Sequence, residues 1–172
     1  MVGTRHTEQT TSLLLASRLP IIETWNITDK PMDIVVGFSN FSAGYQITDY
    51  VVNLKYKKIA FATPFEGFMK NENRSKRRLN GYLSRIKEAN LKPIIFYYTQ
   101  PMNHKVCGDE IYDQYKKYKS KLDCIICGSE VSGTGLLSEL LFRQIKVPKN
   151  IGVAGIGNAE ITSLVQPQLT TI

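Results

Sequence analysis

Short apolar runs and amphipathic segments alternate along the chain. The runs are rich in β-branched and aromatic residues and occupy residues 20–25, 33–38, 58–63, 93–98, 123–128 and 151–156. Such continuous runs are typical of strands that are covered on both faces. Between them, apolar residues recur at helical spacing over residues 7–17, 40–54, 72–89, 109–119 and 131–144. This alternation predicts βαβ units and a parallel sheet, which is an α/β fold.

The composition adds that this is an ordinary globular chain. Hydrophobic residues make up 42% of its 172 residues and charged residues 22%. No apolar run approaches the roughly 18 residues that a membrane span needs, and the first residues lack the apolar core of a secretion signal. We therefore expect a cytoplasmic protein with no membrane association.

The candidate redox and metal groups do not form a reactive site. Cys124 and Cys127 form a CxxC, but they lie in the strand-like run LDCIICG, whereas a redox CxxC opens a helix. We expect buried structural thiols. His6 and His104 have no paired nucleophile and no metal-ligand spacing nearby. The sequence thus predicts no catalytic residue, no metal, no cofactor and no enzymatic activity.

The glycine-rich stretch GVAGIGNAE, residues 152–160, does not match a nucleotide site. The dinucleotide fingerprint needs a third glycine where this chain has Glu160, and a P-loop motif is absent. The stretch instead indicates a strand that ends in an open turn of small residues. Ligands of doubly wound sheets lie beyond such strand ends, and Asn158 offers both a donor and an acceptor there.

The net charge of +7 comes from basic runs with two different interpretations. The runs at residues 55–58 and 115–121 lie at or just after helix ends, where solvated cations complement the helix dipole. The run at residues 74–78 lies at a helix start, where cations cost stability unless an anion is present. We hypothesise that Arg78, with Arg74, holds the carboxylate of a sugar acid. A solvated basic turn is the alternative, and direct DNA binding by the run is not expected.

Five ordered stretches resemble the effector domain of LacI/GalR-type transcriptional repressors. KVPKNIGVAGIGN followed by QPQLTTI resembles the family pattern VPxDIxVxGFxD followed by PxLTT. SNFSAGYQITDYVVNLKYKKIAFAT, RRLNGYLSRIKEANL and DCIICGSEVSGTGLL resemble three further family motifs in the same order. The ETW and VGFSN sequences are closest to the gluconate-repressor branch.

The resemblance implies a type I periplasmic-binding-protein-like fold of two Rossmann-like, parallel-sheet subdomains that is incomplete at both ends. We expect residues 1–62 to be part of the N-terminal subdomain, 63–167 the C-terminal subdomain, and 168–172 the start of a crossover strand. Residues 60–64 would form the other crossover. The first residues would be the end of a strand, the helix-turn-helix domain would be missing, and the chain would be poorly stable alone.

The resemblance also assigns ligand-binding positions. Arg78 matches the arginine through which family members hold their effector. The chain departs from the family at three places. It has Ser39-Asn40 where Asp-Asn is common, Ser129-Glu130 where Asn-Asp is common, and Gly157-Asn158 where the family often has Asp after the strand. Loss of carboxylates suits an anionic ligand, although Ser39, Asn40 and Ser129 are equally helix-cap candidates. His6 either lines the cleft or lies in a solvated loop.

The predicted function is therefore a sensor of a sugar acid such as gluconate within a homodimeric repressor. Ligand closure of two subdomains would shift operator binding, with DNA contacted only through the helix-turn-helix domain. The alternatives are a periplasmic sugar-binding protein of the same fold and a flavodoxin-like hydrolase or transferase.

Overall fold

The computed structural model describes residues 6–70, 72–118 and 121–172. Contacts divide the chain into two compact units, residues 1–40 and 41–172, and each is described by itself. Residues 1–5, where we expected the end of a strand, lie outside the described residues, as does Lys119 of the second basic run.

The first unit contains a helix and a small parallel sheet. Helix α1 (Glu8–Ala16) is capped by Thr7, whose hydroxyl oxygen accepts a hydrogen bond from the Thr10 backbone N–H at 3.2 Å. Strands β1 (Ile22–Thr24) and β2 (Ile34–Val36) pair in parallel, with Ile22 opposite Ile34.

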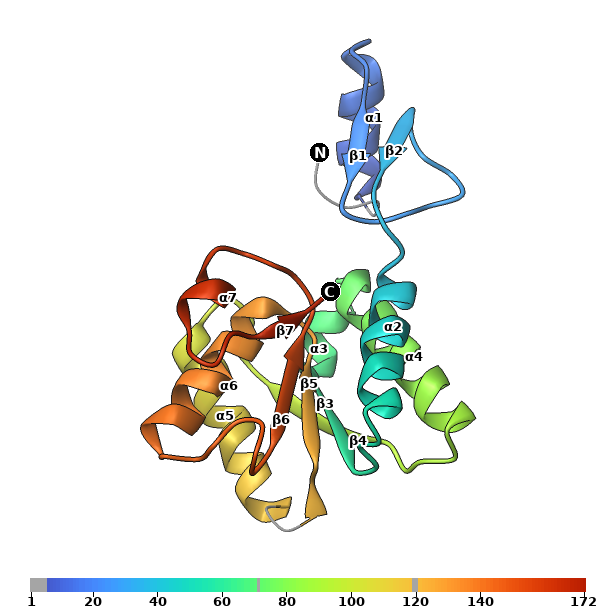
Figure 1. Cartoon of the computed structure of the whole chain (residues 1–172). Coiled ribbons are helices and arrows are strands. Elements are labelled where there is room, and N and C mark those ends of the chain that lie inside the picture. The colour runs from blue at the N-terminus through green and yellow to red at the C-terminus, as the bar shows by residue number, and fades with distance from the viewer. Residues whose placement is uncertain (1–5, 71, 119–120) are drawn as a thin grey trace. The chain divides into compact units, whose positions relative to one another are not determined.

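The second unit is a five-stranded parallel sheet between two layers of helices (Figure 1). The strands are β3 (Ile59–Pro64), β4 (Ile94–Tyr98), β5 (Cys124–Cys127), β6 (Gly152–Gly155) and β7 (Thr170–Thr171). The helices are α2 (Asn40–Asn53), α3 (Glu66–Met69), α4 (Asn73–Glu88), α5 (His104–Tyr118), α6 (Glu130–Phe142) and α7 (Ile161–Leu164). The predicted α/β class with a parallel sheet is confirmed.

The strand order is β4-β3-β5-β6-β7. After β3, the chain adds β4 on one side of β3 and then crosses back to add β5, β6 and β7 on the other side. Helices α2 and α4 cover one face of the sheet, and α5 and α6 cover the opposite face (Figure 1). Alternate residues of β3 serve the two faces: Ala60 and Ala62 point into the α5–α6 layer, while Ile59 and Phe61 point into the α2–α4 layer.

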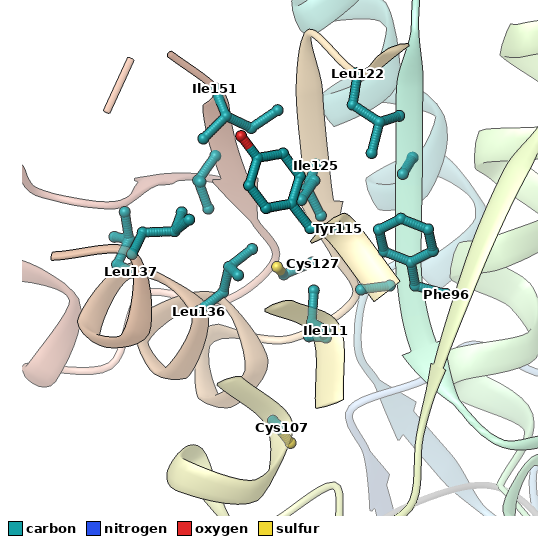
Figure 2. Packing of buried hydrophobic residues seen from close by; sticks show 14 of the residues in the cluster. Phe96, Cys107, Ile111, Tyr115, Leu122, Ile125, Cys127, Leu136, Leu137 and Ile151 are labelled. Carbon is teal, nitrogen blue, oxygen red and sulfur yellow. The ribbon is translucent and has the colours of Figure 1, made fainter. Parts of the chain in front are cut away.

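Both faces of the sheet are apolar, which explains the continuous apolar runs of the sequence. Figure 2 shows the α5–α6 side, where Ile111 and Tyr115 of α5 and Leu136 of α6 pack on Ile125. Cys127 is also fully buried in this core. The expectation of buried thiols is confirmed, because all three cysteines are free and buried.

Side chains of α5 cover the outer edge of strand β4. Gln114 accepts a hydrogen bond from the Tyr97 backbone N–H at 3.1 Å and donates one to the Tyr97 carbonyl at 2.7 Å. Glu110 accepts hydrogen bonds from the Thr99 backbone N–H at 2.6 Å and from its hydroxyl at 2.7 Å. These contacts occupy backbone groups that an edge strand otherwise exposes.

The structure bears on three parts of the sequence prediction. Contacts place residues 41–172 in one unit, because α2 packs on the sheet that contains β3, and the assignment of residues 1–62 and 63–167 to two subdomains stays a prediction. Residues 60–64, expected to cross between subdomains, lie inside β3, which pairs with strands on both sides. Helix α5 begins at His104, five residues before the predicted start. Residues 170–171 form β7 beside β6, and their role as the start of a crossover stays a prediction.

Candidate functional site

The strand order reverses between β3 and β5, so the carboxyl ends of these strands are the candidate ligand site. Strand β4 lies on one side of β3, whereas β5 and β6 lie on the other. In open α/β sheets, ligands bind at such a switch point, outside the carboxyl ends of the strands. The turns that follow β5 and β6, which begin at Gly128 and Ile156, lie at this edge beside the end of β3.

Arg78 reaches this switch point from helix α4. Its Nη1 donates a hydrogen bond of 2.7 Å to the carbonyl oxygen of Gly128, the residue that follows β5. The guanidinium is partly buried, and this burial lowers the pKa of Arg78, while the neighbouring Glu72 and Glu130 carboxylates act in the opposite direction. A desolvated guanidinium interacts more strongly with an anion or a hydroxyl than a fully solvated one.

Two glycines fix the position of the helix that carries Arg78. A Cβ at Gly44 of α2 would overlap the backbone of Arg78, and a Cβ at Gly81 of α4 would overlap the carbonyl oxygen of Phe41. The backbones of α2 and α4 therefore approach each other closely at these two positions. Any larger side chain there would displace α4 and, with it, the guanidinium.

The start of α4 is already occupied by a carboxylate of the chain itself. Glu72 is the N-cap residue, and its oxygens accept hydrogen bonds from the backbone N–H groups of Arg74 at 3.1 Å and Ser75 at 2.7 Å. The same carboxylate binds Nε of Arg74 at 2.5 Å. Burial alone would raise the pKa of Glu72, but the hydrogen bonds from Ser75 and Arg74 outweigh it and lower the pKa. From the sequence we expected that the cations at this helix start would need an anion such as a bound ligand. In the structure, the Glu72 carboxylate of the chain itself supplies the negative charge.

Ser129 and Glu130 lie at the start of α6. Ser129 is the N-cap, and its hydroxyl oxygen accepts a hydrogen bond from the Ser132 backbone N–H at 3.2 Å. Glu130 is the first residue of α6, and a Cβ at Gly157 would overlap its carboxylate. Gly157 has a φ of 107°, a conformation that glycine adopts without strain. This glycine therefore lets the turn after β6 approach the Glu130 carboxylate.

Asn158 is turned back toward its own segment. Its side-chain oxygen accepts a hydrogen bond of 3.0 Å from the hydroxyl of Thr162 in α7. Among the predicted ligand residues, Arg78, Arg74, Ser129, Glu130 and Asn158 thus all belong to the second unit.

The other three predicted ligand residues belong to the first unit. His6 Nε2 lies 3.2 Å from Oε1 of the buried Glu23. The fully buried Asn40 donates hydrogen bonds to the Trp25 carbonyl at 3.1 Å and to Asn26 Oδ1 at 3.4 Å. Ser39 precedes α2 and is partly exposed. These contacts give His6 and Asn40 partners within residues 1–40, and a role in ligand binding stays a prediction for all three.

Sequence reasoning missed Glu72 and the Gly128 carbonyl. Glu72 directly precedes the helix in a polar stretch, so its place was readable, although glutamate is not a preferred N-cap. A backbone carbonyl has no residue-type signal at all.

Within the described parts of the chain, no group of three His, Cys, Asp or Glu side chains is placed to hold a metal ion. Likewise, none of the helices there is long and apolar enough to span a bilayer.

Comparisons with known proteins agree with this architecture. A family model for a periplasmic binding protein-like domain matches residues 48–172. The chain is 24% identical over 167 residues to the HTH-type transcriptional regulator GntR of Escherichia coli, which covers 97% of this chain and 49% of that protein. The chain thus spans about half the length of the curated relatives it matches.

Solved structures of LacI family transcriptional regulators are also similar to this chain in fold. A LacI family transcriptional regulator from Silicibacter pomeroyi has a TM-score of 0.84 and 30% identity, over 99% of this chain and 63% of that one. A LacI family regulator from Enterococcus faecium, solved with bound ribose, has a TM-score of 0.80 and 16% identity, over 96% of this chain and 60% of that one.

Proposed function

Since this chain belongs to the periplasmic binding protein-like domain family of LacI-type transcriptional regulators, we propose that it forms part of the domain that senses a sugar acid of the gluconate kind. In the intact regulator, the bound effector would change operator affinity by favouring one arrangement of the two lobes. The relatives are transcriptional regulators, which favours this function over a secreted binding protein and over an enzyme.

The observation that carries the proposal is Arg78 at the switch point between β3 and β5. Arg78 supplies a partly buried guanidinium that would bind a carboxylate, and Glu130 nearby supplies a carboxylate that would accept hydrogen bonds from sugar hydroxyls. A polyol with a single carboxylate matches this pair. The bound ribose of the Enterococcus faecium regulator supports a sugar-like ligand for this fold.

Calorimetric titration of the intact regulator tests the proposal. We expect gluconate to bind more tightly than glucose, and Arg78→Ala to weaken gluconate binding by about 10- to 100-fold, the range for a hydrogen bond to a charged group. Lys76→Ala is the matched control, because Lys76 is an exposed cation on the same helix. The proposal is wrong if Arg78→Ala weakens gluconate and glucose binding equally, or if neither compound binds the wild-type protein.

We also propose that the intact regulator is a homodimer that uses the α5–α6 surface. Phe142 at the end of α6 is 78% exposed and lines a pocket of about 440 Å³ with Arg143, Glu139 and Lys105. Glu139 pairs with Arg143 at 2.9 Å and lies 3.9 Å from Lys105, so both signs of charge surround the apolar residue. Such a mixed patch can be self-complementary about a two-fold axis.

Sedimentation of the intact regulator measures its oligomeric state. Phe142→Ser should raise the dimer dissociation constant at least tenfold, since it removes an exposed apolar anchor. Leu164→Ser is the control, because Leu164 of α7 is 71% exposed but does not line this pocket. A monomeric wild-type protein, or equal effects of the two changes, would contradict the dimer proposal.

A further inference from the structure

The edge of the sheet opposite the switch point collects lysines from four separate stretches of the chain. Strands β3 to β6 are parallel, so their first residues share one edge, at the lower end of the sheet in Figure 1. An exposed lysine precedes each of these strands by a few residues. These lysines are Lys92 before β4, Lys58 before β3, Lys121 before β5 and Lys149 before β6. We call this set the lysine row.

The register of the sheet sets the spacing of the row. Ala60 pairs with Ile94 and Ile59 pairs with Cys124, so continuing the ladders backward brings Lys58 beside Lys92 on one side and Asp123 on the other. The 2.9 Å hydrogen bond from the Asp123 backbone N–H to the Lys58 carbonyl shows that the ladder between β3 and β5 continues to Lys58, whereas the place of Lys92 follows from extending the β3–β4 register by two residues. Neighbouring strands lie about 4.8 Å apart, so four strand starts spread their lysines over roughly 15 Å.

Further cations extend the row, and few carboxylates balance it. Lys116 and Lys117 lie in the last turn of α5, and Lys116 pairs with Asp113 at 2.7 Å. The Asp123 carboxylate accepts hydrogen bonds from the backbone N–H groups of Lys57 at 3.0 Å and Lys58 at 2.9 Å, so it is engaged by the backbone. The four lysines of the row form no ion pair with any residue in the described ranges. A row of like charges with few counter-charges favours a partner with repeated negative charge.

The chemistry of the row favours nucleic acid over an acidic protein. Lysine is depleted at protein–protein interfaces, whose centres carry aromatic and apolar anchors. Binding to a phosphate backbone needs only exposed cations and releases the counterions condensed on the nucleic acid. Lysine also acts as a point charge rather than as the bidentate fork of arginine, so it contacts phosphates without reading bases.

We propose that the lysine row binds the phosphate backbone of duplex DNA without sequence preference. This contact is separate from the small-molecule site, because the row lies at the amino ends of the strands and Arg78 lies at their carboxyl ends. A regulator with such a row would hold a second, non-specific DNA segment in addition to its operator. The contact would follow the linear dependence of log affinity on log salt that phosphate binding shows.

Fluorescence anisotropy of a labelled 25-base-pair duplex of arbitrary sequence tests this proposal on the 172-residue chain. The test variant is Lys58→Gln/Lys92→Gln/Lys121→Gln. Its control, Lys30→Gln/Lys70→Gln/Lys76→Gln, removes the same charge from exposed lysines elsewhere. At 50 mM salt, we expect the test variant to bind about tenfold or more weakly than wild type and its salt slope to fall by about 3, whereas the control stays near wild type.

Three results would overturn the proposal. The first is that the wild-type chain does not bind the duplex at 50 mM salt, or binds it with an affinity that does not fall as salt is added. The second is an equal loss of affinity in the test and control variants, which would reflect net charge rather than the row. The third is competition by poly-glutamate as strong as that by unlabelled DNA, which would indicate an acidic polypeptide as the partner. Circular dichroism checks that both variants retain the fold, which we expect because all six lysines are exposed.

Discussion

The hydroxyl group of Tyr82 joins the first residues of two neighbouring strands. Tyr82 lies on α4 and is fully buried. Its hydroxyl oxygen accepts a hydrogen bond from the Ile94 backbone N–H at 2.9 Å, and the carbonyl oxygens of Ile59 and Ile94 lie 2.9 and 3.2 Å away as acceptors. Burial raises the pKa of Tyr82 to about 12, so the group stays protonated and able to donate at neutral pH.

Tyr82→Phe removes this hydroxyl and little else. The ring keeps its contact with Phe61, whose centroid lies 5.1 Å away. The Ile94 N–H and the Ile59 carbonyl each lose a partner in a place where water has little access. A buried backbone group without a hydrogen bond costs about 1–3 kcal/mol, so we expect the free energy of unfolding to fall by about that amount or slightly more.

Urea unfolding of the 172-residue chain, followed by circular dichroism, measures this loss. Tyr112→Phe is the matched control, because the Tyr112 hydroxyl forms no hydrogen bond with another described residue, and we expect a change below about 0.5 kcal/mol. If the Tyr82 variant lacks a transition, both variants are measured in trimethylamine N-oxide, which strengthens burial. A Tyr82 variant as stable as the control would refute the reasoning.

Three further predictions concern charge, backbone and thiols. Glu72→Gln should lower the urea midpoint at pH 7, and by progressively less as the pH is lowered. The pKa of this carboxyl is lowered in the fold, so its charged form adds stability that is fully present above the unfolded value of about 4.5 and is lost as the pH falls through the lower folded value. Gly157→Ala should cost about 1–2 kcal/mol for its positive φ, and a Glu130→Ala background should relieve only the overlap with the carboxylate, which a double-mutant cycle in urea would show. At pH 8, the native cysteines should react with Ellman's reagent far more slowly than in urea, since burial raises the pKa of Cys107 to about 11 and of Cys124 to about 12; rapid labelling of native protein would contradict their burial.

The strands and long helices could be predicted because their signal is local. Continuous apolar runs gave all four strands that begin at Ile59, Ile94, Cys124 and Gly152, within one residue or two. Helices α3 and α7 have only four residues each and show no periodicity. The boundary between the units could not be read from periodicity, because an apolar stripe on α2 does not reveal whether it packs on the preceding or the following strands.

The site and the lysine row depend on contacts between distant residues. The place of Arg78 at a helix start was predictable, but its partner is a backbone carbonyl 50 residues away. The basic run at residues 55–58 was interpreted alone as solvated charge. The register of β3 and β4, extended by two residues, brings its Lys58 beside Lys92. The stretches of sequence around these two lysines do not indicate that they are neighbours.

The contacts that Gln114 and Glu110 make with strand β4 have a practical consequence for work with this protein. An added strand, whether from a fused tag, a misfolded copy or a fibril, would first have to displace two side chains that imitate its hydrogen bonds. Substitutions of Gln114 or Glu110 should therefore be avoided, because we expect them to lower the solubility of the purified protein before they lower the stability of its fold.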